Sequence, residues 1–255
     1  MSSKGKLFLL PAPLQPYSRD VWTLSNFEFS LPARALFEYR RLSTFITESS
    51  KTAYRLLSVI RPNDDVASLS INILDEHSKE EDIFSFIRLL EHGEDIGFFS
   101  EAGLPCIADP GAALAAAAHK KNITVVPISG PSSIILALIA SGFDAQRFSF
   151  LGYLPQDSAQ RKHVIRRIGQ DTAKDHITRL FIETPYRNRA LIQDLLQFLP
   201  IDMHFCFAAN LDTSEQLIIS RSVNQWKAFP GTLPDKVPAV FLIGYPATIK
   251  PLNTV

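Results

Sequence analysis

Residues 95–105 have the sequence Asp-Ile-Gly-Phe-Phe-Ser-Glu-Ala-Gly-Leu-Pro. The first half, Asp95–Ser100, is a short apolar run typical of a strand, and the second half consists of small residues and proline, which are typical of a loop. Three further apolar runs end in the same kind of loop: Leu7–Leu10 before Pro11-Ala-Pro-Leu14, Ile123–Ile128 before Ser129-Gly-Pro-Ser-Ser133, and Leu180–Ile182 before Glu183-Thr-Pro-Tyr-Arg187. The sequence therefore predicts several strands that share one kind of ending.

Helical patterns lie between these strands. The apolar residues Ile83, Phe86, Ile87 and Leu90 follow helical spacing, and Gly93 stands where a C-terminal cap is expected. Two more helices are predicted, over Leu191–Leu199 with Pro185 near the first turn, and over the small residues Ala112–Ala118. Additional strands are predicted at Phe148–Leu151, His204–Ala208, the Ile218–Ser222 region and Ala239–Ile243. Because strands alternate with helices, the predicted fold class is α/β with much parallel pairing.

The 255 residues suffice for one large domain or two modest domains. The stretch from Phe143 to Gln156 separates two halves, and the second half contains strands that indicate a mixed sheet. We therefore predict an N-terminal α/β domain over residues 1–142 and a C-terminal α/β domain over residues 143–255, with a cleft between them.

Composition excludes several classes of protein. Apolar and charged fractions are those of a globular chain, and no apolar run is long enough to span a membrane. The N-terminus lacks the pattern of a signal peptide, and two cysteines without metal-ligand spacing indicate neither a disulfide framework nor a metal site. These features favour a cytoplasmic protein without a metal or a membrane partner.

The formal net charge is zero, but basic residues cluster in two places. The clusters are Arg34, Arg40, Arg41, Lys51 and Arg55, and then Arg161, Lys162, Arg166 and Arg167. Such clusters are either solvated helix faces or contacts for nucleic acid.

The strand-end loops are the candidate ligand site. In open α/β sheets, ligands bind outside the carboxyl ends of strands, where small residues let backbone atoms approach a ligand. Strand-to-helix turns also favour these residues without any ligand. The chain has no Gly-x-Gly-x-x-Gly loop, Walker loop, zinc cluster or Gly-x-Ser-x-Gly elbow, which disfavours the common nucleotide enzymes, zinc enzymes and serine hydrolases.

The loops resemble those of one family. Ser100-Glu-Ala-Gly-Leu-Pro-Cys-Ile-Ala-Asp-Pro-Gly111 is similar to the Ser-Asp-Ala-Gly-Thr-Pro-x-Ile-Ser-Asp-Pro-Gly signature of the tetrapyrrole (class III) methylase superfamily. Four more segments resemble family motifs in the same order: Leu9–Leu14, Val126–Ser133, Phe150–Pro155 and Phe181–Arg187. The nearest branch is ribosomal RNA small-subunit methyltransferase I, which methylates a cytidine 2′-hydroxyl in the decoding region.

The resemblance implies two α/β domains in a homodimer, with S-adenosyl-L-methionine bound in the interdomain cleft. It implies methyl transfer to a ribose 2′-hydroxyl of ribosomal RNA, with ribosomal RNA or a ribosomal subunit as the partner. Glu48 and Lys51 are the candidate catalytic base and cation, the alternative being a surface ion pair. The candidate cofactor-binding residues are Pro11, Pro13, Leu14, Ser100, Glu101, Ala102, Gly103, Pro105, Ser129, Gly130, Pro131, Ser132, Ser133, Leu151, Glu183, Thr184, Pro185, Asn210 and Leu211.

The departures from the family fall mainly on charged positions. Gln15-Pro16-Tyr17 replaces Gly-Asn, Glu48-Ser-Ser-Lys51 replaces Glu-Asp-Thr-Arg, Glu101 replaces an aspartate, and Ala209-Asn-Leu-Asp-Thr213 replaces Arg-Glu-Leu-Thr-Lys. A small-molecule (tetrapyrrole-like) methyltransferase and an inactive cofactor-binding homologue therefore stay open as alternatives. An RNA enzyme should carry a basic cleft built from Arg40, Arg41, Lys51 and Arg161, and a small-molecule enzyme should show a wide apolar trough.

Overall fold

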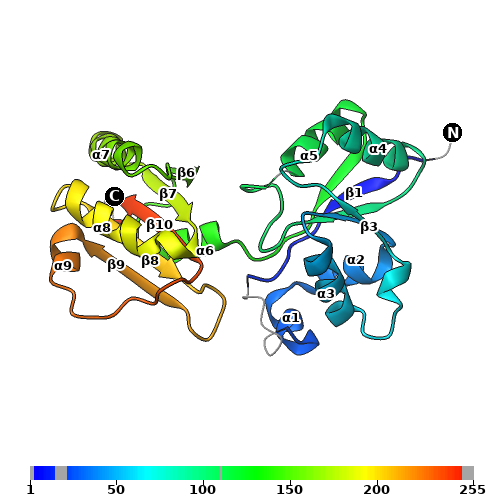
Figure 1. Ribbon diagram of the computed structural model, residues 1–255, viewed down its shortest axis with the longest axis horizontal. Helices are drawn as coiled ribbons and strands as arrows, with labels where there is room; N and C mark the ends of the chain where they lie inside the picture. Colours follow the sequence, from blue (N-terminus) through cyan, green and yellow to red (C-terminus); the bar gives the residue numbers. More distant parts are fainter. Residues whose placement is uncertain (1–2, 15–21, 110, 249–255) are drawn as a thin grey trace, which may run out of the picture. The chain divides into compact units, whose positions relative to one another are not determined.

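The computed structural model describes residues 3–14, 22–109 and 111–248. The chain forms two compact units, residues 1–132 and 133–255, and each contains a five-stranded sheet (Figure 1). The sequence placed the boundary after residue 142. Helix α6 (Ser133–Ser141) lies between the two positions and packs against strands of the second sheet.

The first unit is built on a parallel sheet in the order β3-β2-β4-β1-β5. Parallel neighbours need crossover connections, which helices provide here. The strands are β1 (Lys6–Leu9), β2 (Thr44–Thr47), β3 (Ser70–Ile73), β4 (Ile96–Phe99) and β5 (Thr124–Pro127). The helices are α1 (Leu24–Ser30), α2 (Ala33–Arg41), α3 (Ser50–Ile60), the 3-10 turn η1 (Val66–Ser68), α4 (Glu80–Glu91) and α5 (Gly111–Lys120).

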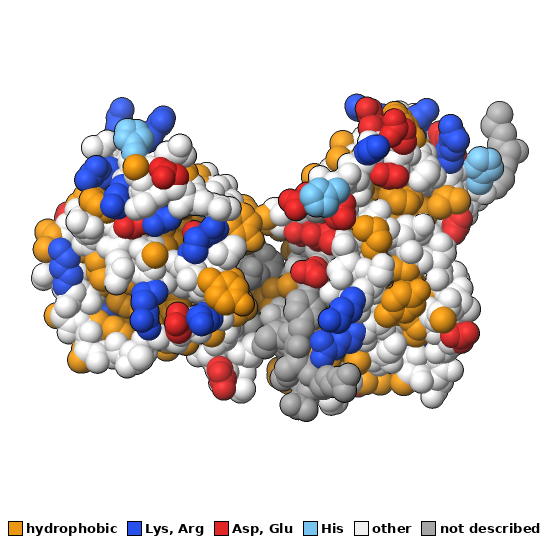
Figure 2. All heavy atoms as spheres, in the orientation of Figure 1, with side chains coloured by type: hydrophobic (Ala, Val, Ile, Leu, Met, Phe, Trp, Pro, Cys, Tyr) orange, Lys and Arg blue, Asp and Glu red, His pale blue; other side chains and the backbone are white. Residues whose placement is uncertain are grey.

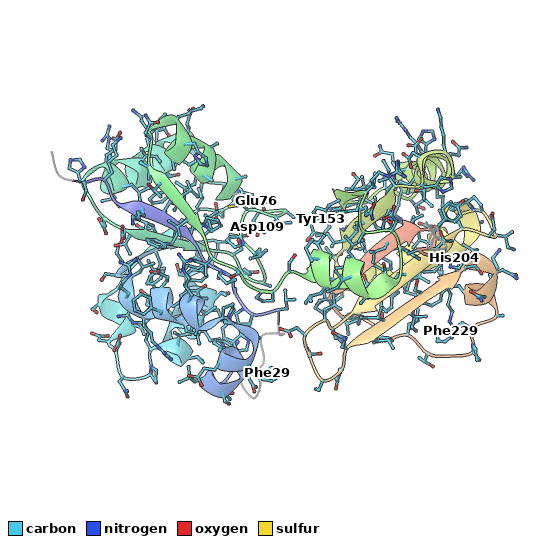
Figure 3. All side chains as sticks on the ribbon, turned by 180° about the vertical axis from the view of Figure 1, so that it is seen from behind. Phe29, Glu76, Asp109, Tyr153, His204 and Phe229 are labelled. Atoms are coloured by element: carbon cyan, nitrogen blue, oxygen red, sulfur yellow. The ribbon has the colours of Figure 1, made fainter. Side chains whose placement is uncertain are left out.

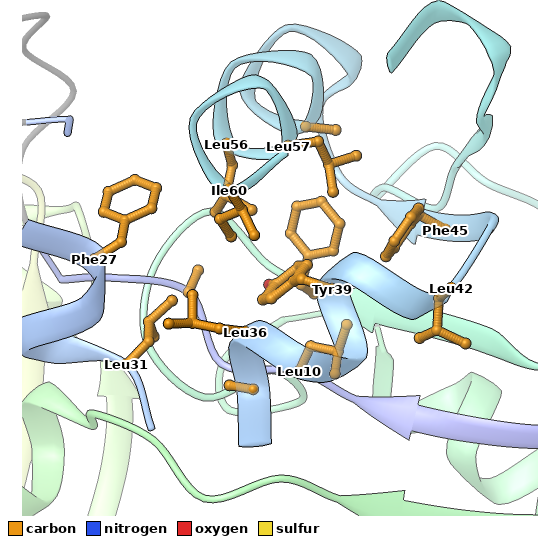
Figure 4. Close-up of a cluster of buried hydrophobic side chains, with 14 of the residues drawn as sticks. Leu10, Phe27, Leu31, Leu36, Tyr39, Leu42, Phe45, Leu56, Leu57 and Ile60 are labelled. Carbon is orange, nitrogen blue, oxygen red and sulfur yellow. The ribbon is translucent and has the colours of Figure 1, made fainter. Parts of the chain in front are cut away.

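Both faces of the first sheet are buried. Side chains alternate between the faces along each strand, so neighbouring residues enter different cores. Phe45 and Phe99 pack with Tyr39 in the core formed by α1, α2 and α3 (Figure 4). Their neighbours Ile46 and Phe98 belong to the core under α4 and α5. This double burial explains the apolar runs that the sequence shows at β1 and β4.

The second unit has a mixed sheet in the order β6-β7-β10-β8-β9. Only β6 and β7 pair in parallel, and the other pairs are antiparallel. The strands are β6 (Phe148–Tyr153), β7 (Thr178–Glu183), β8 (His204–Ala209), β9 (Leu217–Ser222) and β10 (Ala239–Gly244). The other helices are α7 (Ser158–Asp175), the 3-10 turn η2 (Pro185–Arg187), α8 (Asn188–Phe198) and α9 (Val223–Lys227).

The strand directions in this sheet determine which loops meet. Because β10 is antiparallel to both β7 and β8, these two strands run the same way as β6. Tyr153, which ends β6, and His204, which begins β8, accordingly lie at opposite ends of the sheet (Figure 3). The loops after β6, β7 and β8 therefore leave from one edge.

The elements confirm most of the predicted pattern. All predicted strands and the three predicted helices are present, with ends shifted by a few residues. The sequence missed β2 and β3, which are short and contain polar residues. In the described part of the chain, no helix is long and apolar enough to cross a bilayer.

Candidate functional site

The first group of predicted site residues lies at the carboxyl edge of the first sheet. Since β1, β2, β4 and β5 are parallel, the segments that follow them leave from the same edge. These segments are Pro11–Leu14 after β1, Glu48 after β2, Ser100–Pro105 after β4 and Ser129–Ser132 after β5. We call this group the first-unit edge. The departure at Gln15-Pro16-Tyr17 and the Pro110 of the signature lie outside the described residues.

The loops of the first-unit edge bind one another through their backbones. Ala12 donates its amide proton to the carbonyl of Gly103 at 2.8 Å, and Gly103 donates to the carbonyl of Ala12 at 3.0 Å. The buried Tyr39 hydroxyl donates to the Pro11 carbonyl at 3.2 Å. The loops after β1 and β4 are thus fixed to each other and to α2.

Two glycines have roles inside the protein itself. A Cβ on Gly130 would lie 2.1 Å from the Cβ of Pro11, so only glycine lets these two loops touch. Gly103 has a φ of +72°, a left-handed conformation that glycine adopts easily, and lies against Leu14 and the Pro131 carbonyl. The sequence explained such small residues by the close approach of a ligand. At Gly130 the structure gives a different reason, namely loop packing.

Carboxylates surround Ser100 at this edge. Burial, followed by the neighbouring carboxylate of Asp109, raises the pKa of Glu48 to about 7. Burial also raises the pKa of Asp109, which lies in the loop after β4 (Figure 3), and Glu101 raises it further. Thr52 of α3 donates to Glu101 Oε1 at 3.1 Å. Burial and the neighbouring carboxylates are thus the causes that raise the pKa values of Glu48 and Asp109.

One oxygen atom here, Glu48 Oε1, is buried without a hydrogen-bond partner among the described residues, whereas the Ser100 hydroxyl interacts with the carboxylates of Glu48 and Asp109. Buried polar atoms are normally paired, so Glu48 Oε1 is a place where a ligand donor can bind. Cys106 lies in the same loop, and burial followed by Asp109 raises its pKa to about 11, which makes it a poor nucleophile. Asp109 was not among the predicted site residues, although the signature contains it.

Lys51 points to a different part of the molecule than Glu48. It is an exposed residue in the first turn of α3 and lines a groove with Trp22, Tyr54 and Arg55. Among the described residues, no ion pair joins Glu48 to Lys51. The catalytic assignment of the two residues stays a prediction.

The second group of predicted residues lies at the carboxyl edge of the second sheet. Ala239 of β10 pairs with Glu183 at the end of β7 on one side and with Ala209 at the end of β8 on the other. Thr184, Pro185, Asn210 and Leu211 follow these strand ends directly. Leu151 lies on β6 beside an irregularity in the pairing, next to Gly152 with its φ of +69°. We call this group the second-unit edge. Ser133, the first residue of α6, belongs to the same unit.

The charge of Glu183 at the second-unit edge is compensated. The buried Glu183 accepts hydrogen bonds through Oε1 from the Thr184 amide at 2.6 Å and from Nε and Nη2 of Arg187 at 2.8 and 2.6 Å. Within the described part of the chain, three other acceptors here are buried without a partner, namely Glu183 Oε2, Asn188 Oδ1 and Asp212 Oδ2. Asn188 and Asp212 could not be predicted from the sequence, because the burial of their oxygens depends on the fold.

One of the predicted RNA contacts is wrong. Arg161 is buried and pairs with Asp194 of α8 at 2.7 Å, while its Nη1 donates to the Gln156 carbonyl at 3.0 Å. It joins α7 to α8 and cannot form part of a basic cleft. Arg40 and Arg41 are also engaged, with Glu28 and with Glu38 and Asp95 respectively. Within the described residues, no cluster of His, Cys, Asp and Glu has the arrangement of a metal site.

The order and content of these loops match a known family. The profile described as Tetrapyrrole (Corrin/Porphyrin) Methylases matches residues 40–225. The chain belongs to the tetrapyrrole methylase family.

Relatives of this tetrapyrrole methylase carry one recurring name. A protein from Halalkalibacterium halodurans named ribosomal RNA small subunit methyltransferase I is 31% identical over 196 residues, covering 77% of this chain and 61% of the relative. A protein of the same name from Micromonospora olivasterospora is 27% identical over 227 residues, covering 89% of this chain and 66% of the relative. The match thus spans less than two thirds of the length of these curated relatives.

Solved structures confirm the predicted fold. The methyltransferase CobJ superposes with a TM-score of 0.60 at 14% identity over 96% of each chain. Diphthine synthase superposes with a TM-score of 0.59 at 13% identity, covering 94% of this chain and 90% of that one. The two α/β units are therefore of the tetrapyrrole-methylase type.

Proposed function

We propose that this protein transfers a methyl group from S-adenosyl-L-methionine to ribosomal RNA. Membership of the tetrapyrrole methylase family carries the proposal, because the matched region includes most of the two edges. The shared name of the relatives, ribosomal RNA small subunit methyltransferase I, supports RNA as the acceptor. The acceptor atom expected from the sequence is a ribose 2′-hydroxyl.

The first-unit edge suits this cofactor. S-adenosyl-L-methionine is positively charged at its sulfur and its amino group, and its amino and hydroxyl groups are hydrogen-bond donors. The half-buried carboxylates of Glu48 and Asp109 favour a cation when they are ionised, and Glu48 Oε1 can accept a further hydrogen bond. At the second-unit edge, the unpaired oxygens of Asn188 and Asp212 offer further acceptors. We propose that the predicted binding residues of the first-unit edge contact the cofactor, and those of the second-unit edge stay candidates.

The bound cofactor would supply a methyl group on a positively charged sulfur, activated for in-line displacement. The chain contributes mainly positioning, since loops fixed by the Ala12–Gly103 hydrogen bonds need little ordering when a ligand binds. Glu48 is our candidate for the group that accepts the acceptor's proton, because a carboxylate with a pKa of about 7 is both ionised and basic near neutral pH. Lys51 is the candidate cation near the acceptor.

Methyl transfer tests the proposal directly. The full chain is incubated with S-adenosyl-L-methionine carrying a labelled methyl group, using small ribosomal subunits, total cell RNA and small-metabolite extracts as separate acceptors. We expect label in the RNA of the small subunit and a 2′-O-methylated nucleoside after digestion. Label only in the metabolite fraction would identify a small-molecule enzyme. Cofactor binding without any transfer would identify an inactive homologue.

We further propose a cytoplasmic homodimer. Two exposed isoleucines on α6, Ile135 and Ile139, form an apolar stripe that a second copy can cover. The free cysteines Cys106 and Cys206 are consistent with a reducing compartment. Sedimentation equilibrium of the full chain measures the mass, and a monomer at micromolar concentration would contradict the dimer.

A further inference from the structure

A groove runs along the exposed face of α3, and apart from Lys51 its lining residues have no role in the site described above. It has a volume of about 510 Å³ and is lined by Trp22, Lys51, Tyr54, Arg55, Ser58 and Val59. The residues of α3 among them are spaced three and four apart, so they form one face of the helix. The opposite face of α3, with Ala53, Leu56 and Leu57, is buried in the core (Figure 4).

The groove combines positive charge with aromatic rings. Arg55 places its guanidinium 5.1 Å from the centre of the Trp22 ring, and the Tyr54 side chain is 42% exposed. Lys51 is exposed, and no carboxylate lies within ion-pair distance of it among the described residues. Lys and Arg side chains gather over α3 in Figure 2. None of the lining residues is acidic.

These features fit single-stranded RNA. Proteins that bind single strands combine cations that contact phosphates with flat groups, including aromatic rings and guanidinium planes, on which bases stack. An acidic peptide would use the cations but would gain little from an exposed tyrosine ring beside a guanidinium. The charge and the exposed ring together therefore favour a nucleic acid strand over an acidic peptide.

The position of the groove connects it to the first-unit edge. Helix α3 begins two residues after Glu48, and Lys51 lies in its first turn. From Lys51 to Val59 the helix rises ~12 Å at ~1.5 Å per residue. This equals about three stacked nucleotides at ~3.4 Å per step. A strand lying along α3 would thus lead to the carboxylate edge.

We propose that the α3 groove binds a short single-stranded segment of the RNA substrate, with Lys51 contacting a phosphate and Tyr54 stacking on a base. This inference rests on the proposed function, because it assigns the substrate of that site to a defined surface. It gives Lys51 a phosphate of the substrate to contact, in addition to its place as the candidate cation near the acceptor.

Binding of a fluorescently labelled 12-nucleotide single-stranded RNA to the full chain tests the groove. We expect Tyr54→Ala to weaken binding by at least about fivefold, since stacking on one base contributes ~1–3 kcal/mol. Tyr54→Phe, which keeps the ring, should bind like the wild type. Lys51→Ala should weaken binding and reduce the salt dependence by about one phosphate contact, while Lys120→Ala on α5 should change neither. Thermal melts confirm that the variants fold.

A second measurement locates the RNA on the protein. A 4-thiouridine in the same oligonucleotide is photo-crosslinked, and the modified peptide is identified by mass spectrometry. Crosslinks to residues 51–59 support the inference. Wild-type affinity in both Tyr54→Ala and Lys51→Ala, or an equal affinity for a poly-glutamate peptide that both variants lose, would overturn it.

The same variants separate this inference from the proposed function. One possible result is a protein that binds RNA through Lys51 and Tyr54 and yet transfers no methyl group. That result would support RNA binding at the α3 groove and contradict the proposed methyltransferase activity. Methyl transfer to small ribosomal subunits that neither variant changes would support the proposed methyltransferase activity and contradict RNA binding at the α3 groove.

Discussion

Glu48 at the first-unit edge and Glu183 at the second-unit edge lie in opposite electrostatic surroundings. Burial and the carboxylate of Asp109 raise the pKa of Glu48, and burial and the carboxylate of Glu101 raise the pKa of Asp109. At the second-unit edge, the buried Glu183 is held by the guanidinium of Arg187, four residues along the chain. Ionising Glu48 costs stability in the folded chain, whereas Arg187 compensates the charge of Glu183. We therefore expect the positively charged part of a ligand to bind at the first unit.

The largest effect is expected from breaking the compensated pair. Arg187→Ala leaves the buried carboxylate of Glu183 without its partner, and removing one member of a buried pair costs about 3 kcal/mol. Denaturant unfolding followed by tryptophan fluorescence measures the loss. Arg189→Ala is the matched control, because Arg189 pairs with Asp235 at 4.0 Å on the surface and should cost less than about 0.5 kcal/mol. Equal costs for the two variants would remove the contrast between the edges.

The second effect concerns loop packing at the first-unit edge. Gly130→Ala places a methyl group 2.1 Å from the Cβ of Pro11, so the loops after β1 and β5 must move apart. We expect a loss of about 2 kcal/mol in the free energy of unfolding together with weaker cofactor binding. Ser129→Ala, at the exposed neighbouring position, should change stability little. A stable Gly130→Ala protein with full cofactor affinity would show that the loops need not touch.

A third effect appears in the pH dependence of stability. The pKa of Glu48 is about 7 in the folded chain against an ordinary value of 4.5, so the folded state keeps a proton that the unfolded state releases. Stability should therefore fall as the pH rises through this interval and level off above it. Glu48→Gln does not titrate. Between about pH 5 and about pH 8, the free energy of unfolding of this variant should rise by about 1 kcal/mol relative to that of the wild type. This value is reduced because the carboxyl is partly exposed. Parallel stability curves for the two proteins would contradict the raised pKa.

The affinity for the cofactor should depend on pH in the opposite direction to the stability of the free protein. Because the ionised carboxylate favours a cation, the affinity for S-adenosyl-L-methionine should rise with pH as Glu48 loses its proton. We expect a change of a few-fold between about pH 6 and about pH 8 in calorimetric titrations. Glu48→Gln should show a flatter profile. A wild-type affinity that falls over this interval would place the cationic group elsewhere.

The sequence predicted the strand-end loops well because they are encoded locally. Apolar runs followed by proline and small residues show where β1, β4, β5 and β7 end, and parallel pairing then brings the ends of the first three to one edge. It missed β2, whose four residues Thr44–Thr47 include two threonines that give no clear apolar run. It also missed β3, an edge strand with polar residues at Ser70 and Asn72.

Contacts between residues that lie far apart along the chain could not be predicted from the sequence. Arg161 appeared to belong to a basic helix face, and only its position opposite Asp194 on α8 shows that it is buried. The reason for Gly130 was equally hidden, since Pro11 lies far from it along the chain. Spacing within one helix or strand is visible in a sequence, whereas a partner on another element depends on the finished fold.

The reciprocal hydrogen bonds between Ala12 and Gly103 have a consequence for local opening. Each amide proton is held by the other residue's carbonyl, so neither can meet solvent unless the two loops separate. Their hydrogen-deuterium exchange should then occur in one shared event, at a common rate well below that of the amide of the exposed residue Ala102. A bound ligand would slow both amides together. The exchange rate of these two amides therefore indicates whether a ligand is bound at the first-unit edge.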